Sequence, residues 1–271
     1  MGRVLTISSA ERAERRLRLG AATLPESFRY VEAAGDVVGL TGEDDWPARA
    51  VAAVSRGARG VLVVDPVLVD VESVGSATGD IDVAVVLDRG WASSPSVARA
   101  AEEFARVIDR DALVESRVDL PVDGEIAEVL SRHLALVRAA VAPVSSLRLV
   151  RHGPTGYDAV GVLEGGARVS LTGVFSSALP EAAMVRTVRQ TVTVILELGP
   201  VDVAAPGRLR ILEDGVERSP LTPFETPHRA AWRRLHDAVV SGQGVDDITA
   251  FAADAGVLSA ALEGVGARAD A

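Results

Sequence analysis

The stretch GVLVVDPVLVD, residues 60–70, is the part of the sequence that decides the fold. Gly60 is followed by four apolar residues, and Asp65 and Pro66 end the run. A short apolar run between such breakers predicts a strand buried on both faces, as in a parallel sheet. Because the carboxyl ends of such strands face the ligand crevice of an open α/β sheet, Asp65 is expected at that crevice.

Strand-like and helical segments alternate on both sides of this strand. Ser8 and Glu11 have the spacing of a capping box, Pro47 suits a first helical turn, and Gly20 and Gly57 suit helix ends. The order strand–helix–strand–helix–strand–strand–helix is typical of a doubly wound parallel sheet, so we predict an α/β, Rossmann-like domain over residues 1–110. The expected strands are 4–7, 36–41, 60–64 and 80–88, and the expected helices are 8–20, 47–57 and 94–108.

Beyond about residue 112 the pattern changes to period-2 alternation. In residues 167–175, for example, Ala167, Val169 and Leu171 alternate with polar side chains, and residues 164–166 suit a hairpin turn. We therefore predict that residues 111–271 form an α+β domain with a large, mostly antiparallel sheet, closed by the C-terminal helices. The expected strands are 112–122, 145–152, 157–163, 167–175, 187–198 and a short one within 208–217, and the expected helices are 124–141, 228–242 and 246–264.

The composition excludes several classes of protein. The 271 residues include no cysteine, so there is no disulfide framework, thiolate nucleophile or thiolate metal site. The net charge of −10 argues against nucleic acid and anionic membranes as partners. No apolar run approaches a membrane span and no secretory signal follows Met1, so we expect a cytoplasmic protein. His152, His228 and His236 lack metal-ligand spacing, so no metal site is expected.

The order of elements resembles the Gfo/Idh/MocA family of NAD(P)-dependent sugar and cyclitol dehydrogenases over nearly the whole chain. In that family a Rossmann domain binds the dinucleotide, and a mixed sheet supplies the substrate site and the oligomer interface. The resemblance is carried by residues 36–67, 132–141, 157–173 and 228–244.

Several of the family's chemical parts are missing. The chain resembles the family from its second strand onward, so no G-x-G-x-x-G turn precedes residues 4–7, and Ser8 and Ser9 stand where a ribose-binding acid is usual. The resemblance therefore implies a shortened Rossmann-like domain, and we expect no dinucleotide cofactor. Val64-Asp65-Pro66 replaces the family's Glu-Lys-Pro motif, and no lysine occurs anywhere in the chain. His133 matches the family's Asp-x-x-x-His pair, but the aspartate position holds Val129.

His133 and Asp65 are thus the candidate catalytic residues, and Thr41, Trp46 and Trp91 complete a candidate cleft with them. The resemblance implies that Asp65 and His133 lie on opposite walls of that cleft. Each residue also has a structural interpretation. Asp65 is a turn former or helix cap, His133 is a hydrogen-bonded structural histidine, and the two tryptophans pack in a core or lid.

Two classes of function follow. The first is a non-catalytic member of the family: a partner or scaffold subunit, or a ligand-binding pseudoenzyme. The alternative is an enzyme acting on a sugar- or cyclitol-like or other small molecule, either a truncated dehydrogenase whose start lies upstream or a cofactor-independent lyase or isomerase that uses His133 and Asp65. An upstream start would explain the missing glycine turn but not Asp65 or Val129, so we favour the first class.

An oligomer is expected through the second domain's sheet. One face of residues 191–198 carries Val192, Val194, Leu196 and Leu198 and should pack on the helices. The opposite face is then left for another subunit to cover. The partner is a second copy or an intact family member, and a small-molecule ligand is a further option.

Overall fold

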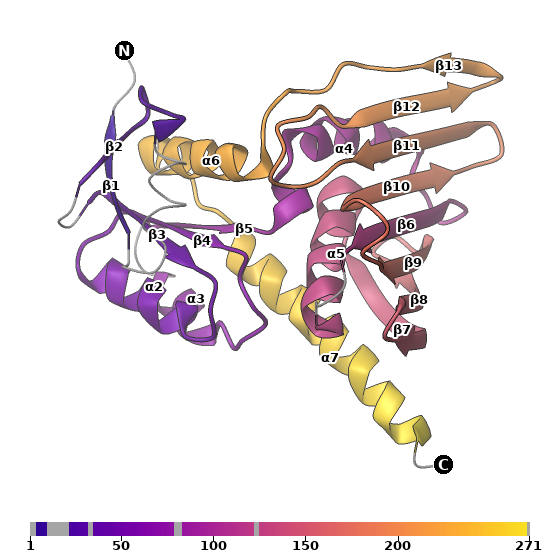
Figure 1. Ribbon diagram of the computed structural model, residues 1–271, viewed down its shortest axis with the longest axis horizontal. Helices are drawn as coiled ribbons and strands as arrows, with labels where there is room; N and C mark the ends of the chain where they lie inside the picture. Colours follow the sequence, from indigo (N-terminus) through magenta and orange to yellow (C-terminus); the bar gives the residue numbers. More distant parts are fainter. Residues whose placement is uncertain (1–3, 10–21, 32–34, 79–82, 122–124, 270–271) are drawn as a thin grey trace. The chain divides into compact units, whose positions relative to one another are not determined.

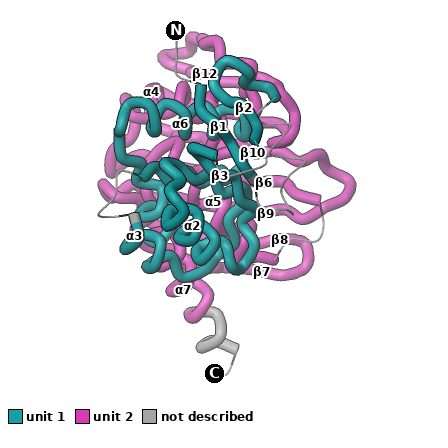
Figure 2. Tube along the Cα trace, turned by 90° about the vertical axis from the view of Figure 1, so that its left-hand side faces the viewer, with its two compact units in different colours: residues 1–90, 227–252 teal, residues 91–226, 253–271 magenta. Residues whose placement is uncertain are grey.

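The computed structural model describes residues 4–9, 22–31, 35–78, 83–121 and 125–269, and the chain divides into two compact units. Unit 1 comprises residues 1–90 and 227–252, and unit 2 comprises residues 91–226 and 253–271 (Figure 2). The change of pattern in the sequence predicts a single boundary after residue 110. The units instead assign helix α4 (Pro95–Val107) to unit 2 and α6 (Pro227–Ser241) to unit 1, because α4 packs on strands of unit 2 and α6 on strands of unit 1.

Unit 1 holds a parallel sheet of five strands in the order β2-β1-β3-β4-β5 (Figure 1). The order confirms the predicted doubly wound sheet, and its switch point lies between β1 and β3, where connections leave in opposite directions. Most of the predicted helix 8–20 lies outside the described residues. The strands are β1 (Leu5–Ser9), β2 (Phe28–Tyr30), β3 (Val37–Thr41), β4 (Gly60–Val64) and β5 (Ala84–Asp88).

Helices cover both faces of this sheet, so β4 is buried along its whole length, as predicted. Leu62 and Val64 pack with α6, and Val61 and Val63 pack with α2 (Trp46–Ser55) and α3 (Glu72–Thr78). Helix α3 was not predicted.

Unit 2 holds an eight-stranded sheet in the order β13-β12-β11-β10-β6-β9-β8-β7. Only the β6–β9 pair is parallel among the pairs described, which confirms a large, mostly antiparallel sheet. The predicted strand 187–198 is in fact parts of two strands, joined where the Arg189 N–H donates to the Val192 carbonyl at 2.9 Å. The strands are β6 (Leu113–Leu120), β7 (Val144–Gly153), β8 (Gly156–Leu163), β9 (Arg168–Phe175), β10 (Ala182–Val188), β11 (Val192–Leu198), β12 (Arg208–Glu213) and β13 (Val216–Arg218).

One face of this sheet packs against α4 and α5 (Ile126–Ala140), which lie on the same side of it in Figure 1. The predicted alternation is confirmed, since Val169 and Leu171 of β9 and Val194 and Leu196 of β11 are buried. We call the opposite side the open face. The last helix, α7 (Asp247–Ala269), is joined to α5 by an Arg138–Asp254 ion pair of 2.8 Å. No helix in the described ranges has the length and apolarity to cross a bilayer.

Candidate functional site

His133 lies in the middle of α5 with none of its surface exposed, and both of its ring nitrogens are hydrogen-bonded. Ser116 Oγ donates to the Met184 carbonyl at 3.1 Å, so it can only accept from His133 Nε2, 2.8 Å away. The proton therefore sits on Nε2, and Nδ1 accepts from the Tyr157 hydroxyl at 2.8 Å. The four residues form one continuous chain of hydrogen bonds, from the Tyr157 hydroxyl through His133 and Ser116 to the Met184 carbonyl.

This burial keeps the network neutral. Desolvation lowers the pKa of His133 to about 3 and raises the pKa of the Tyr157 phenol far above its ordinary value. A general base needs a free lone pair within reach of its substrate, whereas both nitrogens of this ring are engaged. The geometry therefore favours the structural interpretation of His133. Sequence reasoning missed Ser116 and Tyr157, although Ser116 stands at a buried-face position of β6 between Val114 and Val118, where a polar residue needs a partner.

Asp65 follows β4 in a left-handed backbone conformation, with φ of 51°. Its side chain is exposed, and its N–H donates to the Asp88 carbonyl at 3.0 Å. Gly42 packs against this turn so closely that a Cβ there would lie 2.3 Å from the Asp65 carbonyl oxygen. Aspartate is one of the few residues that tolerate this conformation, so the turn alone accounts for its presence.

The two tryptophans of the predicted cleft lie in apolar cores. Trp46 is fully buried, donates to the Val67 carbonyl at 3.2 Å and meets Phe251 edge-on, with ring centroids 5.9 Å apart. Trp91 is 4% exposed and donates to the Gly199 carbonyl at 2.8 Å. These contacts favour the packing interpretation of both residues.

The five residues of the predicted cleft are divided between the units. Thr41, Trp46 and Asp65 belong to unit 1, and Trp91 and His133 belong to unit 2. Thr41 ends β3, and its carbonyl accepts a 2.7 Å hydrogen bond from an α2 arginine. The convergence of the two groups in one cleft stays a prediction.

A second buried polar cluster, missed from the sequence, lies at the carboxyl end of β5. Asp88 is 3% exposed, and its Oδ2 lies 2.9 Å from His228 Nδ1. The Trp232 indole donates to His228 Nε2 at 3.2 Å, so the Nδ1 proton points at the carboxylate. The hydrogen bond between His228 and Asp88 joins α6 to the end of β5 in the parallel sheet. The i, i+4 spacing of His228 and Trp232 on one helix was the available signal.

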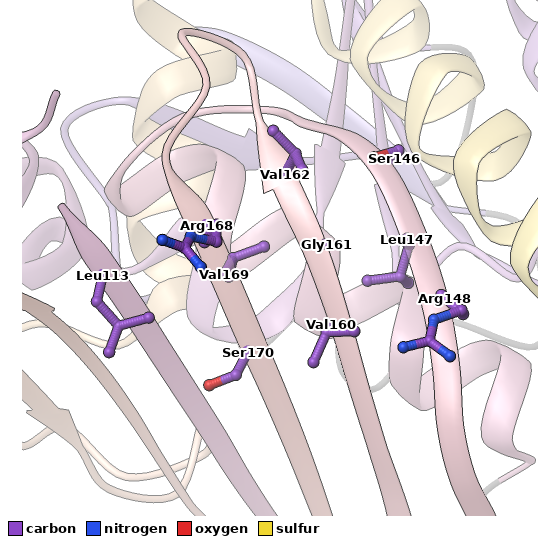
Figure 3. Close-up of a pocket in the computed structure, with 10 residues that line it drawn as sticks. All are labelled: Leu113, Ser146, Leu147, Arg148, Val160, Gly161, Val162, Arg168, Val169 and Ser170. Carbon is purple, nitrogen blue, oxygen red and sulfur yellow. The ribbon is translucent and has the colours of Figure 1, made fainter. Parts of the chain in front are cut away.

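The open face of unit 2 carries a depression of about 460 Å³ over strands β6 to β9. Its floor is mainly apolar, and Figure 3 shows the Arg168 and Arg148 side chains on opposite sides of β8. The lining residues are Leu113, Ser146, Leu147, Arg148, Val160, Gly161, Val162, Arg168, Val169 and Ser170.

No protein-family model and no curated protein sequence matches this chain. Solved structures do. The 3-ketoreductase KijD10 from Actinomadura kijaniata, in complex with NADP and TDP-benzene, is 13% identical over 97% of this chain and 98% of its own, with a TM-score of 0.69. The UDP-N-acetylglucosamine 3-dehydrogenase GnnA from Acidithiobacillus ferrooxidans is 13% identical over 96% of both chains, with a TM-score of 0.73.

A putative NADPH-dependent oxidoreductase from Desulfitobacterium hafniense is 12% identical over 98% of this chain and 96% of its own, with a TM-score of 0.74. The chain has the Gfo/Idh/MocA-type oxidoreductase fold. The expectation drawn from the order of elements is therefore confirmed at the level of fold.

This fold implies a dinucleotide at the carboxyl edge of the parallel sheet, but the described residues there do not fit one. The edge carries four exposed carboxylates, and the guanidinium of Arg49 is already held by the Thr41 carbonyl and, at 3.0 Å, by Asp45. A pyrophosphate needs backbone N–H groups or cations, so these carboxylates would repel it. The four are Glu43, Asp44, Asp45 and Asp65.

Proposed function

We propose that this chain is a non-catalytic member of the Gfo/Idh/MocA type, acting in the cytoplasm as a partner or scaffold subunit. The observation that carries the proposal is the chain of hydrogen bonds that engages both ring nitrogens of His133. The histidine that matches the family's catalytic position is fully buried and has no free ring nitrogen. The matching lysine position holds Asp65, whose exposed side chain stands on a tight turn.

The proposal includes the absence of dinucleotide binding. Its support is the carboxylate-rich edge described above. Titration calorimetry with NAD and with NADP should detect no binding at micromolar concentrations. A micromolar dissociation constant for either cofactor would overturn this part of the proposal.

The alternative is an enzyme, and the observation in its favour is fold similarity to a ketoreductase and a dehydrogenase over nearly the whole chain. The His133→Ala variant separates the two functions when it is compared with the wild type in folding and in turnover of sugar-like substrates. A non-catalytic subunit should change only in stability or assembly. Loss of a measurable turnover in a variant that keeps its fold would establish the enzyme.

We also propose that the open face of unit 2 is an association surface, for a second copy or for an intact family member. Its support is a set of apolar side chains exposed on that face, with Leu113 44%, Val160 40% and Val162 37% exposed. Apolar side chains that gather on one exposed face typically mark an interaction site. Native mass spectrometry of the purified chain tests the proposal, and a strictly monomeric mass at micromolar concentration would count against self-association.

A further inference from the structure

The depression on the open face has a regular pattern across three neighbouring strands. The middle strand, β8, contributes two valines, and β9 and β7 on its two sides each contribute an arginine and a serine (Figure 3). The cross-strand neighbours are Arg168, Val162 and Ser146 in one row, and Ser170, Val160 and Arg148 in the next. We call the two valines the strip and the two arginine–serine pairs the walls. The depression is thus an apolar strip between two polar walls of the same composition.

The arginines of the walls differ from the other arginines of this sheet. Every other arginine on its strands has a carboxylate oxygen within 3.9 Å. Among the residues that the structure describes, Arg148 and Arg168 have no ion-pair partner. The hydroxyls of Ser146 and Ser170 have no hydrogen-bond partner in the same part of the chain. Each wall therefore presents a guanidinium and a hydroxyl that are both available to a ligand.

Two carboxylates on the strands of the depression are already engaged. Glu115 of β6 is paired with Arg186 of β10. Asp158 of β8 accepts hydrogen bonds from Arg151 at 2.8 Å and from Thr172 at 3.1 Å. The walls therefore keep their positive charge, although the whole chain has a net charge of −10. An anion that pairs with them has to come from outside this part of the sheet.

The spacing of the walls sets the length of that ligand. Since β8 separates β9 from β7, the walls lie two strand spacings, about 10 Å, apart. A guanidinium with a neighbouring hydroxyl supplies the donors that a carboxylate or another oxyanion accepts. The volume of about 460 Å³ lies within the range of about 300–1,000 Å³ that is typical of small-molecule sites.

We propose that the depression binds an elongated organic diacid. Its apolar body lies on the strip of Val160 and Val162, and each of its two acidic groups is held by the arginine and the serine of one wall. This inference goes beyond the proposed function, because it assigns a ligand site that neither the non-catalytic role nor self-association requires.

A rigid diacid tests the site by titration calorimetry with the full chain. The probe is biphenyl with a carboxylate at each end, because its rings keep the two acids apart and little conformational freedom is lost on binding. We expect a dissociation constant on the order of 100 μM or tighter. Biphenyl with a single carboxylate should bind at least about fivefold more weakly, because it leaves one wall unpaired. Equal affinity for the two probes, or no binding of the diacid at about a millimolar, would overturn the proposal.

Substitutions in the walls give the second test. Arg148→Gln and Arg168→Gln should each weaken binding of the diacid by at least about fivefold. Both side chains are exposed, so the melting temperature should not change. Arg208→Gln is the matched control, because Arg208 is an exposed arginine of β12 outside the depression and its loss changes the net charge equally. An equal loss of affinity in the control would show a response to net charge alone and would overturn the proposal.

A substitution in the strip tests the apolar body of the ligand. Val160→Thr keeps the branched shape of the side chain and adds a hydroxyl, so it should weaken binding of both biphenyl probes by about fourfold. Val150→Thr is the control, since Val150 is 56% exposed on β7 and does not line the depression. Unchanged binding in Val160→Thr would show that the strip does not hold the ligand.

These outcomes are separate from those of the proposed self-association, although both use Val160 and Val162. A monomeric chain that binds the diacid would support this inference and count against self-association. An oligomeric chain that binds no diacid would overturn this inference alone.

Discussion

Acid should destabilise this protein through His133, and the size of the effect follows from its burial. In the unfolded chain the ring takes up a proton below its ordinary pKa of 6.5, but in the folded chain desolvation lowers that pKa to about 3. The unfolded state therefore binds more protons between these values, and stability falls as the pH falls through this window. Above pH 6.5 the contribution of the group is constant.

The magnitude comes from about 1.36 kcal/mol for each unit of pKa shift. Between pH 7 and pH 5 the unfolded state gains about 2 kcal/mol from protonating this one ring, and by pH 3 the gain approaches about 5 kcal/mol. The assay is urea denaturation of the wild type and of His133→Gln at half-unit intervals from pH 7 to pH 5. Other groups titrate in both proteins, so the difference between the two free energies of unfolding isolates His133.

That difference should shrink by about 2 kcal/mol as the pH falls to 5, because the glutamine does not titrate. His152→Gln is the matched control, since His152 lies on the exposed side of β7 and the variant makes the same chemical change. A wild-type-to-variant difference that stays constant with pH would refute the reasoning, since a buried neutral imidazole cannot give that result.

Three substitutions test other features. The Thr187 hydroxyl is buried and has no hydrogen-bond partner among the described residues, so Thr187→Val should stabilise the chain by about 1 kcal/mol in urea denaturation, and a loss of stability would contradict this. Gly42→Ala should cost about 2 kcal/mol or more, because its Cβ would strike the backbone of Asp65; an unchanged melting temperature would argue against that packing. Glu103→Gln should cost about 1–3 kcal/mol, because Glu103 is 2% exposed and its carboxylate accepts a hydrogen bond from Arg218. Arg218 also holds the carboxyl pKa below its usual range, so the group is charged from pH 5 to pH 8. If the variant and the wild type were equally stable in that range, this role would be disproved.

The elements that sequence reasoning found are those decided by local pattern. β4 is an uninterrupted apolar run, and α4 begins with Ser94 as a true cap, whose side chain accepts from the Ser96 N–H. The turn at residues 189–191 was missed because Arg-Gln-Thr lacks the usual turn residues. β2 was missed because it has only three residues.

The candidate site was less predictable because its decisive contacts are long-range. The partners of His133 lie 17 and 24 residues away in sequence, on two different strands. From the sequence, His133 could be interpreted as structural or as catalytic, and no local pattern distinguishes the two. The hydrogen bond between Asp88 and His228 joins residues that lie 140 positions apart in sequence, so no local pattern could predict it.

The return of α6 to unit 1 has a consequence for synthesis on the ribosome. Trp232, Leu235 and Val239 fill the core on one face of the parallel sheet, and a Cβ at Gly60 would lie 2.6 Å from Val239. Strand β5 emerges about 150 residues before this helix is complete, an interval of roughly 8–30 s at ordinary translation rates. During that time the apolar face of β4 has no cover from α6. Until residue 241 has been made, the nascent chain therefore exposes an apolar sheet face of the kind that makes folding intermediates prone to aggregate.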